Sequence, residues 1–404
     1  MSKSNETTPN VPTLRFPNYS GEWQVSSMGK VCTFRKGYGI SKENLSSDGT
    51  PCILYGELYT TYKTAIAKSI KSKTSLDPKL LFHSKKNDVI IPCSGETAED
   101  IATSVCIPYN DILLGGDLTV IRSDLDGAFL SNQINSVRKY DIARIAQGKS
   151  IVHLQADELK KISIAYPTID EQQKISGFID KIDERIEVQN KIISDLKVLK
   201  KELMDYILNT CDFMELSIKD LIDCGFARII KASEMKKFNG TRKYLSTSSI
   251  GENGIEQVES IITYTDRPSR ASMLPIKGSI WFAKMKNSVK VYQSTDDDEN
   301  LYILSTGFYG LLCDETKVNS RWIIELFKSD YFNAQKDKFS EGSSMSGIKD
   351  SQLADITLKV FADKKQEKYH TNNIQNLSKK IQLEKNTLEV LMKQKQFFLN
   401  AMFI

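Results

Sequence analysis

The residues able to perform covalent or metal chemistry are few and widely spaced. No two of the seven cysteines form a C-x-x-C pair, and the three histidines lie far apart in the sequence. Zinc sites and disulfide frameworks use short, repeated spacings of such residues, so this pattern argues against both and favours reduced thiols. No Ser/His/Asp or Cys/His catalytic set can be assigned either. The residues concerned are Cys32, Cys52, Cys93, Cys106, Cys211, Cys224, Cys313, His83, His153 and His370.

Nucleotide-binding and acid–base motifs are missing from the sequence as well. No G-x-x-x-x-G-K-[ST] occurs, and the glycine pair in "LLGGDL" (Leu113–Leu118) lacks the spacing of a dinucleotide-binding turn. No Asn-Pro-Pro-aromatic motif of an amino-methyltransferase occurs. Carboxylates near lysines, such as Glu158 and Lys160, could suggest a nuclease, but with 26% charged residues such pairs arise by chance. The sequence therefore predicts a chain that is not itself an enzyme.

Length and composition predict two or three globular domains. The chain has 404 residues, of which 40% are hydrophobic, enough to form buried cores. Its formal net charge of +4 is only weak support for a nucleic-acid partner. The opening segment "MSKSNETTPNVP" is polar, and no stretch approaches the roughly 18 apolar residues of a membrane span. We expect a cytoplasmic protein without a membrane partner.

An internal repeat organises the whole sequence. The segment "AQGKSIVHLQADELKKISIAYPTIDEQQKI" is matched by "SEGSSMSGIKDSQLADITLKVFADKKQEKY". Gly148 matches Gly342, Leu159 matches Leu353, Ile162 matches Ile356 and Gln172 matches Gln366, each pair 194 residues apart. Between Gln366 and Ile374 the offset becomes 195, as one inserted residue would produce. Chance similarity between two helices would not reproduce these flanking matches, so the sequence predicts a duplication.

A long helix follows each copy of the repeat. Apolar residues recur at alternating steps of three and four, which is the seam of a coiled coil. Polar residues interrupt both seams at equivalent positions, Gln189 with Glu384 and Lys200 with Lys395. The seam residues are Ile179, Ile182, Ile186, Ile193, Leu196 and Leu203 in the first helix, and Ile374, Leu377, Ile381, Leu388, Leu391 and Phe398 in the second.

The two helices are predicted to pair with each other as an antiparallel coiled coil. Each seam helix spans about 33 residues, or about 50 Å at ~1.5 Å per residue. One register places Lys200 opposite Glu384, Lys395 opposite Gln189 and Phe398 opposite Ile186, which matches apolar layers with apolar layers. A coiled coil between two chains is the alternative, and the duplication favours pairing within one chain.

The segments that precede the helices have a different character. Residues 22–150 and 213–345 contain short runs such as "DVIIPC" and "GSIWFAK", which are rich in β-branched and aromatic residues and bounded by turn residues. The predicted fold class is α+β, with two mixed α/β globules, each followed by a long helix, in an internal pseudo-twofold repeat. The predicted domains are a first globular domain (1–160), a central helix (161–210), a second globular domain (211–358) and a last helix (359–404).

Three stretches resemble the specificity subunit of type I restriction-modification enzymes. They are "LRFPNYSGEW" (Leu14–Trp23), the central "AYPTIDEQQKISGFIDKIDERIEVQNKIISDLKVLKKELMDYIL", and the last "LEVLMKQKQFFLNAMFI". With the order of the repeats, the resemblance covers the whole chain. The second copy, "VFADKKQEKY", departs from the family pattern because it lacks the proline and the Glu-Gln pair.

This resemblance implies a DNA-recognition subunit without catalysis of its own. Two target recognition domains would each read one half of a split site in double-stranded DNA, and the helices would set their separation. Two modification subunits would dock on the helices and methylate adenine with S-adenosylmethionine. Restriction subunits, which use ATP and Mg, would complete the complex. No cofactor or metal is then expected in this chain.

Contacts with DNA need Lys and Arg for phosphates, and Arg, Gln, Asn, Ser or Thr for base edges. Under this resemblance, polar loops of the two globules are the candidates. The loops 147–150 and 342–346, which lead toward the helices, could contact DNA or a modification subunit. The candidate residues are Arg35, Lys36, Tyr38, Lys42, Ser94, Thr97, Gln133, Asn135 and Arg138 in the first domain, and Arg242, Lys243, Tyr244, Arg267, Arg270, Lys284 and Lys286 in the second.

Two other functions fit parts of the sequence. A two-domain coiled-coil adaptor that binds a protein partner, and not DNA, would show the same globules and seams. A specificity domain fused to a single-chain restriction enzyme would need catalytic motifs, which the sequence lacks. A methyltransferase gene beside this one would favour the specificity subunit.

Overall fold

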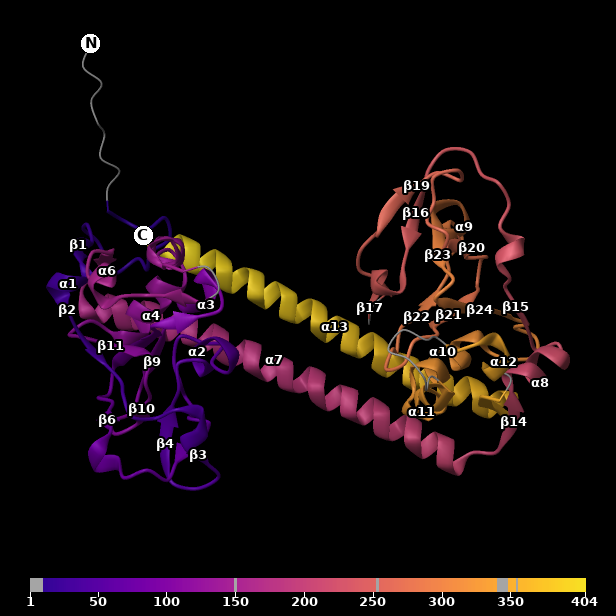
Figure 1. Cartoon of the computed structure of the whole chain (residues 1–404), viewed down its shortest axis with the longest axis horizontal. Helices are drawn as coiled ribbons and strands as arrows, with labels where there is room; N and C mark the ends of the chain where they lie inside the picture. The colour runs from indigo at the N-terminus through magenta and orange to yellow at the C-terminus, as the bar shows by residue number, and fades with distance from the viewer. Residues whose placement is uncertain (1–9, 149–150, 252–253, 340–347, 354) are drawn as a thin grey trace, which may run out of the picture. The chain divides into compact units, whose positions relative to one another are not determined.

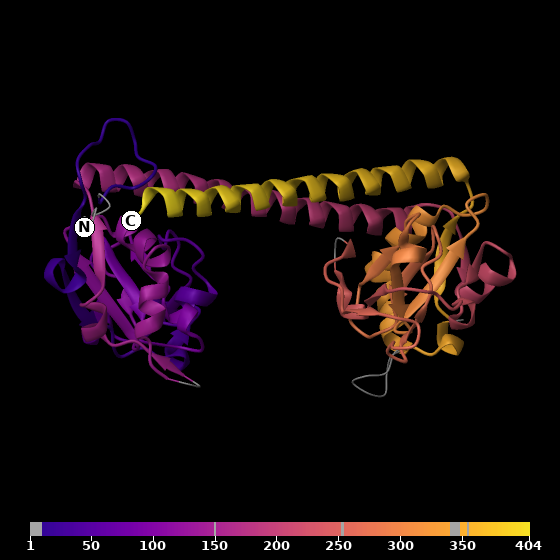
Figure 2. The ribbon, with the colours of Figure 1, turned by 90° about the horizontal axis from the view of Figure 1, so that it is seen from above.

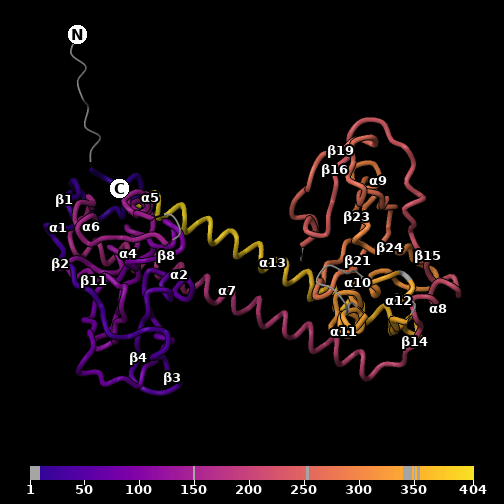
Figure 3. The backbone as a smooth tube through the Cα atoms, viewed as in Figure 1, coloured from indigo at the N-terminus to yellow at the C-terminus, as the bar shows by residue number. Residues whose placement is uncertain are grey.

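The computed structural model describes the chain except for residues 1–9, 149–150, 252–253, 340–347 and 354. The chain forms two compact units. Unit 1 comprises Met1–Lys191 and Asn386–Ile404, and unit 2 comprises Ile192–Lys385 (Figures 1 and 2). Each unit therefore contains one globule together with a part of each long helix, as the backbone trace shows (Figure 3).

Unit 1 is built on an antiparallel sheet in the order β2-β11-β7-β9. The run "DVIIP" forms β7, which is buried along its whole length, as β-branched residues in a central strand should be. Helix α4 packs against β7 and β9. Its core-facing residues and those of these two strands form one hydrophobic core. The bounds are β2 Cys32–Lys36, β7 Asp88–Pro92, β9 Val105–Ile107, β11 Leu118–Ser123 and α4 Gly127–Asn135.

A second, mixed sheet lies beside the first in unit 1, in the order β3-β5-β4-β10-β6. Strands β4 and β10 pair in parallel, and the other pairs are antiparallel. Figure 1 shows β3, β4, β6 and β10 together at one end of the unit. The bounds are β3 Leu45–Ser46, β4 Thr50–Ile53, β5 Ser72–Thr74, β6 Phe82–His83 and β10 Leu113–Leu114.

Short elements complete the first globule. Strand β1 pairs antiparallel with β13, and β13 leads directly into the first long helix, α7. The remaining elements are β1 Gln24–Ser27, α1 Met28–Val31, α2 Glu57–Thr60, β8 Ser94–Gly95, α3 Ala98–Ile101, α5 Lys139–Ile145, β12 Val152–His153, α6 Ala156–Leu159 and β13 Ser163–Tyr166.

Unit 2 repeats the two sheets of unit 1 and the strand pair that precedes the long helix. Its antiparallel sheet β15-β24-β21-β22 corresponds to the first sheet of unit 1, and β19-β16-β23-β20 again contains a single parallel pair, β16 with β23. The β14–β25 pair leads into the second long helix, α13, as β1–β13 leads into α7. The strands are β14 Phe213–Ser217, β15 Ala227–Ile229, β16 Arg242–Leu245, β17 Ile250–Gly251, β18 Gly254–Ile255, β19 Ser260–Ile262, β20 Ala271–Met273, β21 Ile280–Ala283, β22 Val291–Gln293, β23 Tyr302–Ser305, β24 Phe308–Cys313 and β25 Thr357–Phe361; the helices are α8 Ile218–Asp223, α9 Asp298–Leu301, α10 Ser320–Lys328, α11 Asp330–Phe339 and α12 Asp350–Leu353.

The two long helices are α7 (Ile169–Thr210) and α13 (Lys364–Met402). Inside each unit they run antiparallel. In unit 1 the rings of Phe178 and Phe398 lie 4.8 Å apart, and Lys395 pairs with Asp183 at 2.6 Å. In unit 2 the Sγ atom of Cys211 lies 3.4 Å from Nε2 of His370. All twelve seam residues named from the sequence are buried or half-buried.

The predicted register of the helices is wrong. Lys395 was expected opposite Gln189 and Phe398 opposite Ile186, but their partners Asp183 and Phe178 lie six and eight residues earlier in α7. Lys200, expected opposite Glu384, instead pairs at 2.7 Å with Glu325 of α10, a carboxylate outside the coiled coil. The apolar layers repeat every heptad, so several registers satisfy them, and the globules decide among these registers.

The Glu-Gln pair at the start of α7 holds unit 1 together. The carboxylate of Glu171 is 1% exposed and accepts two hydrogen bonds of 2.7 Å from Arg15, within the opening segment that resembles the family. Gln172 accepts a hydrogen bond from the backbone N–H of Asp126 at 2.9 Å and donates one to the carbonyl of Pro167 at 2.8 Å. Two of the three stretches that suggested the family are thus in direct contact.

The structure corrects the alignment at this point. In unit 2, Glu367 accepts a hydrogen bond from the backbone N–H of Asn319 at 3.0 Å, and Asn319 caps α10 as Asp126 caps α4. Glu367 is therefore the equivalent of Gln172, whereas Gln366, chosen from the sequence, is exposed. The inserted residue therefore enters before this contact, between the start and the end of β25, which is one residue longer than β13.

The contact predicts an asymmetric response to exchanging the two side chains. Gln172→Glu should destabilise unit 1 by about 1–3 kcal/mol, because the carboxylate would face the Pro167 carbonyl without a donor. Glu367→Gln should cost less, since its amide oxygen can still accept from Asn319 and only the pair with half-exposed Lys364 is lost. Urea unfolding of both variants measures the difference. Equal losses would show that the two positions are not equivalent.

Candidate nucleic-acid interface

Basic and aromatic side chains gather on the mixed sheet of unit 2. The guanidinium of Arg242 stacks on Phe238, 4.4 Å from the ring centroid, and that of Arg267 stacks on Tyr264 at 4.2 Å. The two rings contact each other edge to face at 5.7 Å. We call these four residues the arginine–aromatic cluster. Such pairs are worth about 0.5–1 kcal/mol at exposed sites and hold the guanidinium planes in place.

The two arginines of this cluster have different partners. Arg267 donates a hydrogen bond to the carbonyl oxygen of Tyr264. Among the residues that the structure describes, Arg242 makes no ion pair, and partial burial lowers its pKa while nearby Glu299 raises it. Arginine remains charged under these conditions. Arg242 therefore presents at the surface a positive charge that has no ion-pair partner among the described residues. The plane of its guanidinium is held by stacking on Phe238.

The neighbouring candidates divide between surface and core. Lys243 is exposed, with its ammonium 6.0 Å from the Tyr302 ring centroid, and Arg270 is exposed as well. Tyr244, however, is only 6% exposed and belongs to an apolar core with Ile262 and Ile303. The prediction that Tyr244 contacts DNA is therefore wrong, because alternate residues of β16 face opposite sides of the sheet.

The hairpin between β21 and β22 carries two more candidates. Lys286 is exposed and Lys284 is half-buried. Lys336 of α11 anchors this hairpin and is only 1% exposed. Its ammonium donates hydrogen bonds to the carbonyl oxygens of Met285 at 3.2 Å, of Ala283 at 3.4 Å and of Ser288. A buried ammonium that bonds three backbone carbonyls fixes the shape of this loop. Nothing in the sequence pattern of α11 singles out Lys336.

Four candidates in unit 1 lie along β2 and the chain that follows it. Arg35 and Lys36 are exposed residues of β2, and not of a loop as the sequence suggested. Tyr38 is 53% exposed and packs edge to face on Phe82 at 6.1 Å, and Lys42 is exposed at the start of a 3-10 turn. No carboxylate pairs with these three cations among the described residues.

The close packing of this segment depends on Gly37. A Cβ atom on Gly37 would lie 2.3 Å from the carbonyl oxygen of Gly115, which no side chain could tolerate. The glycine thus allows the chain that carries Tyr38 to lie against the β10 end. This explains why the glycines occur beside the basic residues.

Two lysines in unit 1 were missed from the sequence. Lys71 and Lys73 are exposed and, with Ser46 and Ser72, line a cleft of about 380 Å³ at the edge of the mixed sheet. Neither makes an ion pair within the described part of the chain. The alternation in "KSKT" places Lys73 of β5 and Lys71, which directly precedes this strand, on the same side of the chain, and that pattern could have identified them. The mixed sheets of both units thus carry unpaired cations.

Five candidates in unit 1 have structural partners instead. Ser94 and Gln133 are buried, with 9% and 0% exposure, and Gln133 donates to the carbonyl of Ala165 at 2.7 Å. Asn135 exchanges hydrogen bonds with the backbone of Ser104. Thr97 caps α3, and Arg138 donates to the carbonyl of Ile404 at 3.0 Å. Gln133 faces the core and the amide of half-buried Asn135 is bonded to Ser104, so the predicted contact of these two residues with DNA bases finds no support in the packing of α4. The loop residues 149–150 and 342–346 lie outside the described residues.

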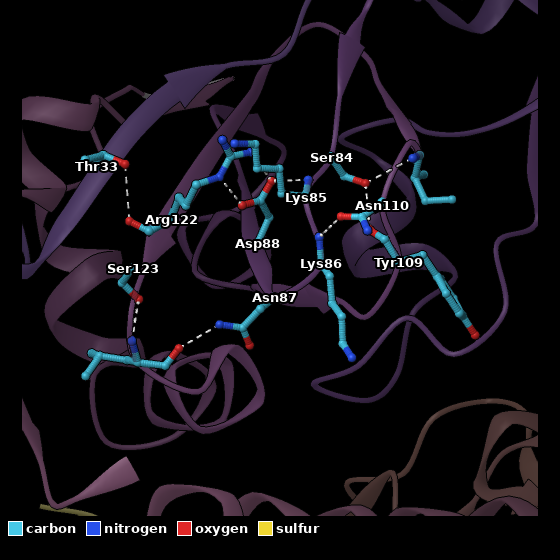
Figure 4. A network of polar contacts seen from close by, with 12 residues as sticks. Thr33, Ser84, Lys85, Lys86, Asn87, Asp88, Tyr109, Asn110, Arg122 and Ser123 are labelled. Carbon is cyan, nitrogen blue, oxygen red and sulfur yellow. Dashed lines mark hydrogen bonds and ion pairs between the residues drawn. The ribbon is translucent and has the colours of Figure 1, made fainter.

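The strand that follows Lys85 and Lys86 is fixed by a buried ion pair. Asp88 is 1% exposed, and both its carboxylate oxygens accept from Arg122 of β11 at 2.6 Å (Figure 4). Asp88 also accepts from the backbone N–H of Lys85 at 2.7 Å. Asn87 lies in the left-handed region and bonds the chain at Leu125 and Gly127. These contacts position the central strands that support the mixed sheet.

In the part of the chain that the structure describes, no three His, Cys, Asp or Glu side chains gather where they could hold a metal ion. All seven cysteines are free thiols. The contact between Cys211 and His370 was not expected from the sequence; His370 stacks on Phe361, and burial lowers its pKa. None of the described helices is both long and apolar enough to cross a bilayer.

Removing the unpaired lysines Lys71 and Lys73 of unit 1 should weaken DNA binding in a way that depends on salt. Lys71→Ala with Lys73→Ala should weaken binding to all duplexes alike, and should reduce the slope of log affinity against log salt by about two. Lys160→Ala with Lys161→Ala is the matched control, since both lysines pair with neighbouring carboxylates. Titrations at several salt concentrations measure the slope. An unchanged slope for the first pair would remove these lysines from the interface.

Comparisons with known proteins agree with this arrangement. A family model described as "Type I restriction modification DNA specificity domain" matches residues 20–198. The chain is similar to the type I restriction-modification system S subunit from M. genitalium, with 15% identity, a TM-score of 0.59, and coverage of 98% of this chain and 99% of that one. It is also similar to a chain from a structure described as the basis of complex assembly and conformational transition of the type I R-M system, with 13% identity, a TM-score of 0.54, and coverage of 94% and 96%.

At these sequence identities the solved structures show only the fold. The family model adds a match to a DNA specificity domain in the first half of the chain. Unit 2 repeats the antiparallel sheet, the mixed sheet with its parallel pair, and the strand pair before the long helix that unit 1 contains. Residues 20–198 therefore match the type I restriction-modification DNA specificity domain, and along its length the chain has the fold of the S subunits of these systems.

Proposed function

We propose that this chain recognises a split DNA site for a type I restriction-modification complex, and that its two units each read one half. The observation that carries the proposal is the repeat: the fold whose first copy matches a DNA specificity domain occurs twice, and both copies expose unpaired cations on the same mixed sheet. Phosphate contacts from these cations would supply affinity.

The chemistry of the complex belongs to partner subunits in this proposal. Two modification subunits, one for each repeat, would bind S-adenosylmethionine and methylate adenine, and restriction subunits would use ATP and Mg. The chain itself would position these partners on DNA. An adaptor that binds only a protein partner would have no need of unpaired cations on both mixed sheets, and the family match does not favour it.

The test is to express the chain with its candidate modification subunits and to purify the assembly by a tag on this chain. Methylated adenines are then mapped across the genome, with cells lacking this chain as the control. We expect a split motif with a fixed spacer that disappears without the chain. Methylation that is unchanged in the control cells, or a chain that binds no modification subunit, would refute the proposal.

A further inference from the structure

The arginine–aromatic cluster of unit 2 differs from the other basic positions of the chain. Lys243 and Arg270 are exposed side chains, which suits contact with phosphates at varying positions. Arg242 is half-buried, and its guanidinium lies 4.4 Å from the centre of the Phe238 ring. An ordered guanidinium loses little rotational freedom on binding, so its interaction can be directional.

The guanidinium of Arg242 carries a planar fork of N–H donors, and this fork is also available for a ligand. Its side chain makes no hydrogen bond or ion pair among the described residues, so its five N–H donors are not committed to the protein. The carboxylate of Glu299 raises the pKa of Arg242 by its electrostatic field, and it is not an ion-pair partner of Arg242. By contrast, Arg267 has committed one nitrogen to the carbonyl of Tyr264, and its stacking holds that ring against Phe238.

A planar, preorganised fork of donors matches one base edge best. Guanine presents two adjacent acceptors, O6 and N7, in the major groove, and arginine bonds both at once. Adenine replaces O6 with an amino donor, which would oppose the fork, and the pyrimidines offer no such pair. A phosphate would accept the same donors, but it requires no fixed plane and is served by the lysines nearby.

We propose that Arg242 reads a guanine in the half-site of unit 2, with Phe238 as the positioning residue that fixes its plane. This inference rests on the proposed function and adds one base to the unknown sequence of the site. It states that the motif half read by unit 2 contains at least one G·C pair. Tyr264 and Arg267 hold Phe238 in place and are not assigned a base.

The test uses the complex assembled with its modification subunits and duplexes carrying the mapped motif. Each position of the motif is replaced by every base pair, and affinities are compared for the unaltered complex, Arg242→Lys and the control Arg228→Lys. Arg228 lies in the same unit but pairs with Glu234 at 2.9 Å and stacks on no ring. Unit 2 is assigned to one half-site by exchanging residues 213–357 for those of a homologue with another motif.

Arg242→Lys keeps the charge but loses the fork, so the salt slope should be unchanged. Discrimination in favour of guanine should fall about tenfold or more at one position of the unit 2 half-site, and at no position of the other half. Phe238→Leu should relax the same position. Arg228→Lys should change neither half.

A second measurement does not depend on folding of a variant. In the unaltered complex, replacing that guanine by 7-deazaguanine removes N7 but keeps base pairing, and should weaken binding about tenfold. The inference is overturned if no guanine in that half responds, if Arg242→Lys keeps the original preferences, or if Arg242→Ala weakens all sequences equally with a smaller salt slope. A complex that binds no split site would instead refute the proposed function.

Discussion

Asp88→Ala should lower the free energy of unfolding of unit 1 by about 1.5–3 kcal/mol, because it leaves the half-buried guanidinium of Arg122 without its acceptor. Both oxygens of Asp88 are occupied by Arg122 at 2.6 Å, and the carboxylate is almost completely buried. The same substitution also removes the acceptor for the N–H of Lys85. Urea unfolding followed by circular dichroism measures the loss.

The control for this prediction removes both charges. Asp88→Leu combined with Arg122→Met should recover most of the stability, since apolar groups of similar volume often replace a buried ion pair at little cost. The single variants Asp88→Leu and Arg122→Met, together with this double variant, form a cycle that isolates the pair. A loss below about 1 kcal/mol for Asp88→Ala would show that the pair contributes little to holding β7 and β11 together.

Lys336→Met should destabilise unit 2 by about 3 kcal/mol and loosen the hairpin between β21 and β22. The methionine fills the same space but donates nothing to the carbonyls of Ala283, Met285 and Ser288, and each unmet buried acceptor costs about 1–3 kcal/mol. Partial hydration of the loop offsets some of this cost. Thermal unfolding and hydrogen exchange across residues 283–290 report the two effects separately.

Lys338→Met provides the matched control, since Lys338 lies on the same helix and is exposed. It should alter neither hydrogen exchange in the hairpin nor stability beyond about 0.5 kcal/mol. Fast exchange in the hairpin of the unaltered protein would contradict the role given to Lys336.

The same lysine predicts a dependence on pH. Burial lowers the pKa of Lys336 from its ordinary value of 10.5 to about 8. Between these values the unfolded chain holds a proton that the folded chain has lost, so unfolding takes up a proton and rising pH opposes it. The stability difference between the unaltered protein and Lys336→Met should therefore grow from pH 8 to pH 10. A difference that stays constant over this range would show that Lys336 is not perturbed.

The repeat and the helical seams could be predicted from sequence because each depends on local periodicity. The register could not, since shifting by a heptad preserves every apolar layer, and Lys200 finds its carboxylate on α10 and not on the other helix. The alignment of Gln172 failed by one residue for a similar reason. Glu367 performs the same task with a different side chain, and only the shared contact with a helix cap identifies it.

The candidate interface was predicted unevenly. Exposed cations such as Arg35 and Lys286 follow from composition, but the predicted contacts Gln133 and Asn135 lie in the last turn of α4. The residue Asp126 before the apolar run "GAFL" is a helix-cap signal that could have corrected this. The pairing of Arg242 with Phe238 joins residues within a short segment, yet the contact with Tyr264 depends on strand pairing that no local pattern reveals.

The division of the chain between the units has a consequence for its synthesis. Unit 2 is one continuous stretch, 192–385, whereas unit 1 requires residues 386–404, whose Ala401 and Ile404 carbonyls bond Leu14, Gln133 and Arg138. Domains usually fold in the order in which the ribosome makes them. Here the core around Trp23 and Ile179 of unit 1 includes residues from the last helix. Unit 1 therefore completes its folding only after the globule of unit 2 has been synthesised. A nascent chain stalled before residue 386 should therefore protect unit 2 from proteolysis and leave unit 1 open to it.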